Sequence, residues 1–250
     1  FKLTFQEYSD SYRLRISSSS CSHANDAFIR MVNSLSDTSF RFFYREMTSL
    51  EVIEDIYTNR ADVGFIMYPA HKEAEIQDRL MLRHLEFHPL FRSPTQFFCR
   101  VGHPILNERE NLTPEKLYQY NFVLYPSENT RNRAVESLYN DETLQLINWN
   151  LVPQVIYVNS RASLHNLIQR SDYIGIGMIP VREQEENYNI VSFPLPDWMK
   201  PEADRCGDFV AAYIHQKSSS LPKAAKAYIT FLEQYYGPES GYKEKLELKE

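Results

Sequence analysis

The chain has 250 residues, of which 43% are hydrophobic and 24% charged, which is ordinary for a globular protein with one large domain or two smaller ones. Its formal net charge of −6 argues against a surface built mainly to bind nucleic-acid phosphates. No segment approaches the roughly 18 consecutive apolar residues that a membrane helix needs, and the first residues lack the apolar core of a secretory signal.

The N-terminal part of the chain alternates predicted strands and helices. Residues 12–16 form a short β-type run, and the serines at 17–20 and 22 are predicted to form a polar loop before a helix. Residues 40–47 predict a second strand, Thr48 or Ser49 can cap the next helix, and residues 61–68 predict a third strand. Nearly continuous apolar strands separated by helices indicate a parallel sheet covered on both faces.

The rest of the chain repeats this alternation. Residues 95–101 predict a strand that ends before His103-Pro104, and residues 121–125 predict another after a short helix ending at 117–120. The remaining predicted strands cover residues 154–158, 172–179, 190–195 and 208–216, and the remaining helices begin near Arg131, after Asn159-Ser160 and within residues 218–236. The charged tail is expected to be exposed or mobile.

Motifs of catalysis and metal binding do not occur in the sequence. There is no dinucleotide or P-loop glycine motif, zinc-protease motif or serine-hydrolase elbow, so we expect neither an enzyme nor a bound cofactor. The three cysteines, Cys21, Cys99 and Cys206, are odd in number and widely spaced. We therefore expect reduced thiols in a cytoplasmic protein and no disulfide framework.

Four segments resemble the effector-binding domain of LysR-type transcriptional regulators when they are taken in order. They are LRISSS, ADVGFIMY with its acidic Asp62, VGHPIL, and SLHNLIQRSDYIGIGMIP, which ends in the pattern of Gly175, Gly177 and Pro180. The resemblance covers nearly all of residues 12–236. The chain departs from the family at Gln169–Asp172, where the family usually has small residues. The family's DNA-binding winged helix-turn-helix and linker helix do not occur in these residues.

The resemblance implies an α/β fold of two lobes, each a mostly parallel sheet flanked by helices, joined by two crossover strands as in type II periplasmic binding proteins. Lobe I would comprise residues 12–103 and 209–236, and lobe II residues 104–208. Residues 1–11 would end a linker, and residues 237–250 would form the tail. The family also implies a homodimer of these modules, a tetramer of the intact protein, and DNA contact only through the missing N-terminal domain.

Polar side chains follow several predicted strands, at the end of the sheet where open α/β folds bind ligands. The loop at residues 17–22 precedes a helix, so its hydroxyls and the free N–H groups of the helix start favour a carboxylate or another anion. The same serines could simply cap the helix, and Arg131 or Arg161 could pair with an anionic effector or lie in solvent. The residues expected to contact an effector are Ser18, Ser19, Ser20, Tyr68, Ser127, Asn129, Thr130, Asn159, Ser160 and Met178.

Three other groups of residues carry side chains that could form a site. His84, Glu86 and His88 alternate as strand neighbours do and could offer zinc ligands, but Pro89 interrupts the run, so no metal site is expected. Cys21 lies at a helix start, where a thiolate is stabilised, but no resolving cysteine is near in the sequence. The acidic residues Asp172, Glu183, Glu185 and Glu186 are interpreted as a solvated face.

One alternative function stays open at this point. Transport-type solute-binding proteins share the two-lobed architecture, and a signal peptide or lipoprotein cysteine upstream of Phe1 would favour that class. A winged helix-turn-helix upstream would favour the regulator.

Overall fold

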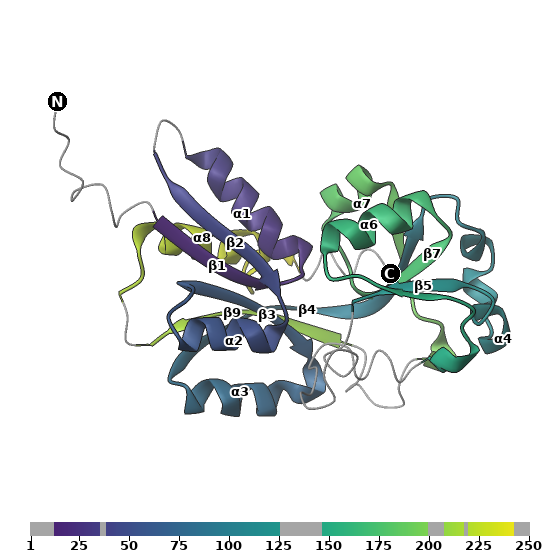
Figure 1. Cartoon of the computed structure of the whole chain (residues 1–250), viewed down its shortest axis with the longest axis horizontal. Coiled ribbons are helices and arrows are strands. Elements are labelled where there is room, and N and C mark those ends of the chain that lie inside the picture. The colour runs from purple at the N-terminus through teal and green to yellow at the C-terminus, as the bar shows by residue number, and fades with distance from the viewer. Residues whose placement is uncertain (1–12, 36–38, 126–146, 200–207, 218–219, 243–250) are drawn as a thin grey trace. The chain divides into compact units, whose positions relative to one another are not determined.

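The structure is a computed structural model that describes residues 13–35, 39–125, 147–199, 208–217 and 220–242. These residues divide into two compact units (Figure 1). Unit 1 contains residues 13–67 and 73–91 and the described residues from Val210 onward, and unit 2 contains residues 68–72 and the described residues within 92–209. No helix within the described ranges is long and apolar enough to cross a membrane.

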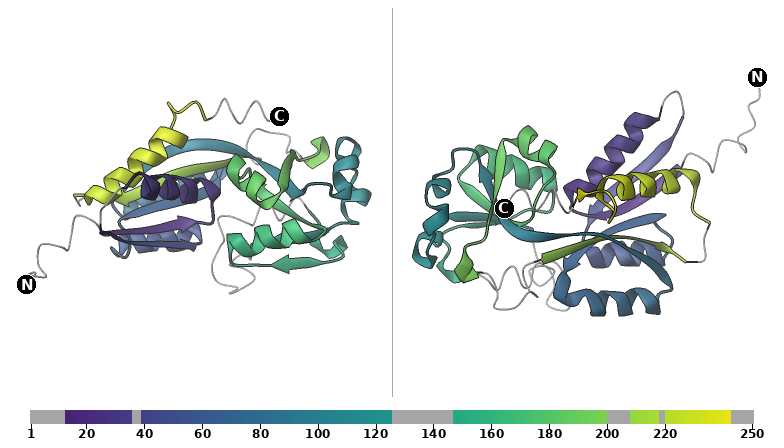
Figure 2. Two further views of the ribbon diagram at one scale, coloured as in Figure 1. Left: turned by 90° about the horizontal axis from the view of Figure 1, so that it is seen from above. Right: turned by 180° about the vertical axis from the view of Figure 1, so that it is seen from behind.

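Unit 1 is built around a sheet with strand order β2-β1-β3-β9-β4. β1 pairs in parallel with β2 and with β3. Helices α1 and α8 cover one face and α2 and α3 the other (Figures 1 and 2). The strands are β1 (Arg13–Ser19), β2 (Arg41–Met47), β3 (Val63–Pro69), β4 (Leu85–Arg100) and β9 (Asp208–Gln216), and the helices are α1 (Ser22–Ser34), α2 (Ser49–Tyr57), α3 (Glu73–Leu82) and α8 (Lys223–Tyr236).

Buried side chains on both faces of β3 explain why this strand lies inside the sheet. All seven residues of β3 are buried, as expected for a parallel strand with helices on both sides. Helix α2 begins with a capping box in which Thr48 and Glu51 satisfy each other's backbone N–H groups. Gly64 lets α2 approach β3, because a Cβ there would lie 2.8 Å from side-chain atoms of both Val52 and Ile214.

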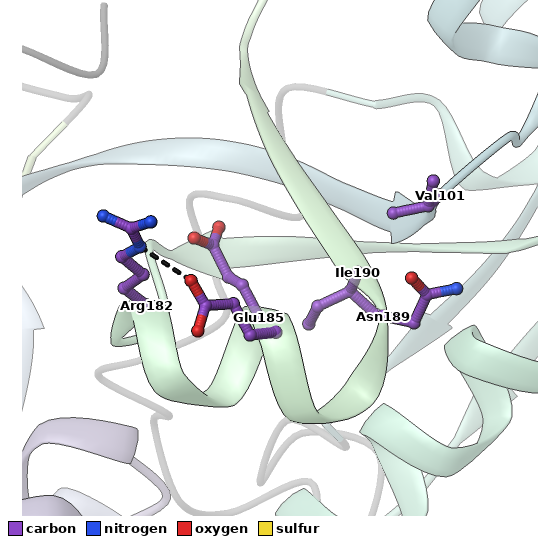
Figure 3. A pocket seen from close by; sticks show the side chains of 6 residues that line it. Val101, Arg182, Glu185, Asn189 and Ile190 are labelled. Atoms are coloured by element: carbon purple, nitrogen blue, oxygen red, sulfur yellow. Dashed lines mark hydrogen bonds and ion pairs between the residues drawn. The ribbon is translucent and has the colours of Figure 1, made fainter.

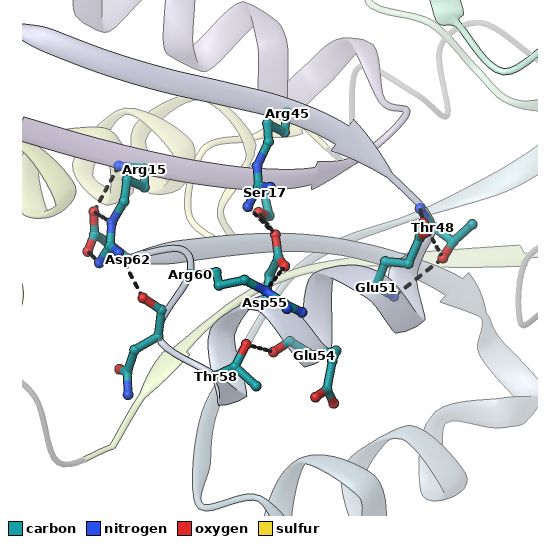
Figure 4. A network of polar contacts seen from close by, with 11 residues as sticks. Arg15, Ser17, Arg45, Thr48, Glu51, Glu54, Asp55, Thr58, Arg60 and Asp62 are labelled. Atoms are coloured by element: carbon teal, nitrogen blue, oxygen red, sulfur yellow. Dashed lines mark hydrogen bonds and ion pairs between the residues drawn. The ribbon is translucent and has the colours of Figure 1, made fainter.

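Two acidic side chains fasten this sheet to its loops and helices (Figure 4). Asp62 accepts hydrogen bonds from the Arg15 backbone N–H at 2.8 Å and from its guanidinium at 2.5 Å. Asp55 on α2 is only 5% exposed and accepts from the Ser17 hydroxyl at 2.6 Å. It also pairs with Arg45 at 2.5 Å and with Arg60 at 2.8 Å.

The second part of β4, from Arg92 onward, belongs to unit 2. There it forms a mixed sheet with strand order β4-β7-β5-β6, and β8 also pairs with β4. β4 runs antiparallel to β7 and β8, whereas β5 runs parallel to β6 and β7. Its other strands are β5 (Asn121–Leu124), β6 (Val155–Tyr157), β7 (Tyr173–Met178) and β8 (Ile190–Pro194), and its helices are α4 (Pro114–Leu117), α6 (Arg161–Arg170) and α7 (Arg182–Tyr188).

Consecutive residues of these strands place their side chains in two different hydrophobic clusters, because side chains alternate across a sheet. Phe97 and Phe122 belong to a cluster with Ile105, Leu117 and other residues, while Phe98 and Val123 pack with Leu164 and Ile168 of α6. The α/β fold class expected from the sequence is confirmed, with the difference that the sheet of unit 2 is mixed and not mostly parallel. The predicted lobe division assigns residues 92–103 to lobe I, whereas in the structure part of this segment pairs with β7 and β8.

Several local predictions need correction. The serines at 17–19 form the end of β1 and not a loop, since their neighbours in β2 and β3 continue the sheet beside them. Helices α3 and α7 were not predicted from the sequence. The predicted mobile tail packs against α1 in its first residues, because the Tyr242 hydroxyl makes a hydrogen bond with the His23 ring. The helix expected near Arg131 lies outside the described residues.

Candidate functional site

The candidate site of unit 1 is the edge of the sheet where β1, β2 and β3 end and α1 and α2 begin. At the end of β1, Ser18 is fully buried and Ser19 is 3% exposed. Ser20 follows the strand and is half-buried. Of the three serines expected to contact an effector, Ser20 therefore has the most accessible surface.

The hydroxyl of Ser19 joins three elements. It lies 2.7 Å from the hydroxyl of Ser49, which donates to the Met67 carbonyl oxygen at 2.6 Å. The Met67 backbone N–H in turn donates to Ser19 Oγ at 3.3 Å. The Ser18 hydroxyl donates to the Ser19 carbonyl oxygen at 2.7 Å. The hydroxyls of Ser19 and Ser49 connect β1, α2 and β3, so the prediction that Ser18 and Ser19 lie in a loop was wrong.

The start of α1 is the second component of this edge. Its N-cap residue is Cys21, whose side chain makes no capping hydrogen bond. The first N–H groups of a helix have no partners inside the helix and carry a partial positive charge. The segment from Ser20 into α1 thus offers a hydroxyl and backbone donors at the carboxyl end of a parallel strand, an arrangement suited to an anion.

Tyr68 occupies a different environment from the one expected. Sequence reasoning placed it at the end of a strand, able to close over a ligand. In the structure β3 continues to Pro69, and Tyr68 is fully buried. Its ring is a part of the core.

In unit 2 the predicted residues lie at the ends of β6 and β7. Asn159 and Ser160 are exposed, and Ser160 caps α6 by accepting from the Ser163 N–H at 3.4 Å. Met178 ends β7, is 7% exposed and pairs with Thr95 of β4. Arg161 donates to the Gln184 side chain at 2.6 Å. Ser127, Asn129 and Thr130 lie outside the described residues.

A shallow pocket of about 380 Å³ also lies in unit 2, beside α7 and the start of β8 (Figure 3). It is lined by Val101, Arg182, Glu185, Glu186, Asn189 and Ile190, none of which was predicted to bind a ligand. Its charged groups already have protein partners, because Arg182 donates to Glu186 at 2.7 Å and Glu185 accepts from Ser192 at 2.6 Å. The pocket therefore offers few unsatisfied polar groups to a ligand.

The possible zinc residues do not converge. His84 precedes β4 with a positive φ of 54°, and the His88 ring stacks on Tyr213 at 4.5 Å and on His215 at 5.3 Å. Within the part of the chain that the structure describes, no three His, Cys, Asp or Glu side chains are grouped so that they could hold a metal ion.

Comparisons with known proteins agree with this architecture. A family model described as the LysR substrate binding domain matches residues 13–237. The chain is similar to the effector-binding domain of QuiR in complex with shikimate, with a TM-score of 0.56 and 15% identity over 90% of this chain and 96% of that one. No curated protein matches the chain.

Two further solved structures show the same likeness. The regulatory domain of MetR from N. meningitidis has a TM-score of 0.55 and 15% identity, covering 92% of this chain and 94% of that one. The reduced form of OxyR from N. meningitidis has a TM-score of 0.55 and 12% identity, covering 89% and 94%. At these identities the structural likeness shows a common fold.

Proposed function

Because the chain belongs to the LysR family as its substrate-binding domain, we propose that it senses a small anionic metabolite for a DNA-binding transcriptional regulator. The family membership carries this proposal. We place the effector, from the resemblance, in the cleft between the two lobes, with Ser20 and the first N–H groups of α1 contacting its anionic group. Ser18, Ser19 and Tyr68 stay proposed contacts, although their side chains are buried in this structure.

The chemistry of the β1 edge supports an anionic ligand. Ser20 is half-buried at the end of β1, and Cys21 leaves the start of α1 without a side-chain cap. Backbone N–H groups at a helix start bind carboxylates without carrying a formal charge. Shikimate, bound in the QuiR structure, is a hydroxylated carboxylic acid, so such acids belong in the first set of compounds to be tested.

In unit 2 we propose Asn159, Ser160 and Met178, together with Ser127, Asn129 and Thr130, as the contacts on the opposite side of the ligand. Asn159 and Ser160 are exposed at the end of β6. The Ser160 hydroxyl accepts from the Ser163 N–H and can still donate its own proton to a ligand. Met178 would contribute an apolar contact.

We propose a cytoplasmic homodimer that assembles into a tetramer with its DNA-binding domains and carries out no catalysis. The matched family favours this reading over a transport-type solute-binding protein. An effector would act by binding one arrangement of lobes and subunits more tightly than another, and a difference of about 1.4 kcal/mol changes their ratio tenfold.

Titration calorimetry of the purified chain against hydroxylated carboxylic acids and amino acids tests the proposal. A hit should lose roughly tenfold in affinity in the Ser20→Ala variant, which corresponds to about 1.4 kcal/mol. The matched control is Ser220→Ala, which changes an exposed serine before α8 and should leave the affinity unchanged. Equal affinity in the wild type and the Ser20→Ala variant would remove the β1 edge from the site. A panel without any binding compound would count against an anionic metabolite.

A further inference from the structure

Cys21 and His23 form a close pair at the beginning of α1. The sulfur of Cys21 lies 3.2 Å from Nδ1 of His23, within hydrogen-bond distance for a thiol and an imidazole. Cys21 is 4% exposed and His23 is fully buried. The sequence shows these residues only as Cys-x-His, and their contact depends on how the chain enters the helix.

The second nitrogen of the His23 ring is also engaged. Nε2 makes a short hydrogen bond with the hydroxyl of Tyr242, which lies beyond the end of α8. Aromatic rings surround the imidazole, with centroids at 4.7 Å for Phe91, 5.0 Å for Tyr236 and 5.2 Å for Tyr242. The ring is therefore fixed in orientation. If both of its nitrogens carry protons, each can donate, one to the Cys21 sulfur and one to the Tyr242 oxygen.

Burial of Cys21 and His23 disfavours charge on either group, and two features beside Cys21 oppose this cost by stabilising a negatively charged sulfur. α1 is a helix of 13 residues, and the positive end of a helix and a protonated histidine both lower the pKa of a cysteine thiol. On α8, Tyr228 donates its hydroxyl to the Ala24 carbonyl oxygen at 3.0 Å, and burial raises its pKa, so it stays neutral. Asp26, an acidic residue on α1, accepts hydrogen bonds from Tyr236 and Arg30.

Cys99 provides the contrast within the same chain. It is fully buried in β4, and desolvation raises the pKa of its thiol to about 12. Because the thiolate is the nucleophile of cysteine chemistry, Cys99 is expected to be inert. The difference in alkylation rate between these two buried thiols therefore reports the effect of the helix start and of His23 on Cys21.

We propose that Cys21 and His23 act as a thiolate–imidazolium pair that captures a small electrophile, an α,β-unsaturated carbonyl compound, by conjugate addition. A lone pair of the sulfur forms an S–C bond to the β-carbon of the electrophile. The electron pair of the C=C bond moves to the α-carbon, which takes the Nδ1 proton of His23. Histidine ends neutral, no group leaves, and neither an oxidant nor a reductant is required.

An adduct on Cys21 would lie beside the proposed effector site. Cys21 directly follows Ser20 at the carboxyl end of β1, the edge at which the anionic effector is proposed to bind. The inference concerns thiol reactivity and goes beyond the proposed function. The low exposure of Cys21 restricts the reaction to compact electrophiles.

Labelling of the full chain with N-ethylmaleimide tests the inference. In the Cys206→Ser background, intact mass and peptide mapping follow Cys21 and Cys99 in the same sample. Cys21 should be alkylated at least about tenfold faster than Cys99 at neutral pH, with a rate that changes little from mildly acidic to mildly basic pH. His23→Gln should slow Cys21 by about tenfold and restore the rise with pH of an ordinary thiol. Tyr242→Phe keeps the ring and should slow the reaction less.

The ultraviolet absorbance of the thiolate gives a second measurement that does not require access of a reagent. The Cys206→Ser chain should retain a thiolate signal at mildly acidic pH that disappears in the Cys21→Ser, Cys206→Ser double variant. Labelling of Cys21 no faster than that of Cys99 overturns the proposal, as does a His23→Gln variant, folded by circular dichroism, with an unchanged rate and absorbance. Neither readout depends on a metabolite, so a failure here leaves the calorimetric result intact.

Discussion

Removal of the Asp55 carboxylate should cost unit 1 about 3 kcal/mol of its free energy of unfolding. The hydrogen bond from the buried Ser17 hydroxyl to this charged group contributes about 1.5–3 kcal/mol. Arg45 and Arg60 have side chains that are 49% and 56% exposed, so each ion pair adds only about 0.2–1 kcal/mol. Asp55→Ala also leaves the Ser17 hydroxyl without its acceptor in a buried position.

Urea unfolding followed by circular dichroism measures this cost. The midpoint of Asp55→Ala should fall with little change in the m-value, and the melting temperature should fall by roughly 2–4 °C for each kcal/mol. Glu54→Ala is the matched control, because the neighbouring Glu54 is exposed on the same helix. A double-mutant cycle should give a larger coupling of Asp55 with Ser17 than with Arg45. If Asp55→Ala lies within about 0.5 kcal/mol of Glu54→Ala, the reasoning is refuted.

Three further predictions concern stability. Ser19→Ala should lower the unfolding free energy by about 1–2 kcal/mol, since it breaks a buried hydroxyl network, and a thermal melt with no shift would contradict this. Burial lowers the pKa of His165 to about 4, so the neutral ring is the form that folding favours. The stabilising contribution of the neutral His165 ring should be fully present above the unfolded pKa of about 6.5 and should be lost as the pH falls toward 4. In urea unfolding at a series of pH values, the His165→Leu variant should lose less stability over this range. Gly175→Ala would place a Cβ 2.2 Å from Phe98 Cε2 and should cost about 1–3 kcal/mol, measured as a lower urea midpoint.

Most of the fold could be predicted from hydrophobic periodicity and the order of motifs. The strand at Asp208–Gln216 was predicted with the bounds that it has in the structure, and α2 begins after Thr48 as expected. Helix α3 was missed because only Ile76 and Leu80 of its ten residues are buried. Helix α7 was missed because it has no buried residue at all, so it carries no apolar period to detect.

The candidate site was less predictable because it depends on contacts between residues distant in the chain. Ser17, Ser18 and Ser19 resemble a polar loop in the sequence. In the structure the hydroxyls of Ser17 and Ser19 bond with Asp55 and Ser49, 38 and 30 residues away. Local propensity cannot report such partners, and tertiary contacts overrode the low strand preference of serine. Only the position of these residues at the end of a strand could be read from the pattern.

In the run of serines at residues 17–20, Ser19 has a structural role in the Ser19–Ser49–Met67 network, and Ser20 is the most accessible of the proposed ligand contacts. Three elements depend on those hydroxyls, so a library that randomises residues 17–19 in search of a new biosensor specificity would yield mostly poorly folded clones. Diversity placed at Ser20 and at exposed Asn159 would leave the scaffold intact. Under the proposed site, ligand preference is set mainly by side chains other than those that keep the chain folded.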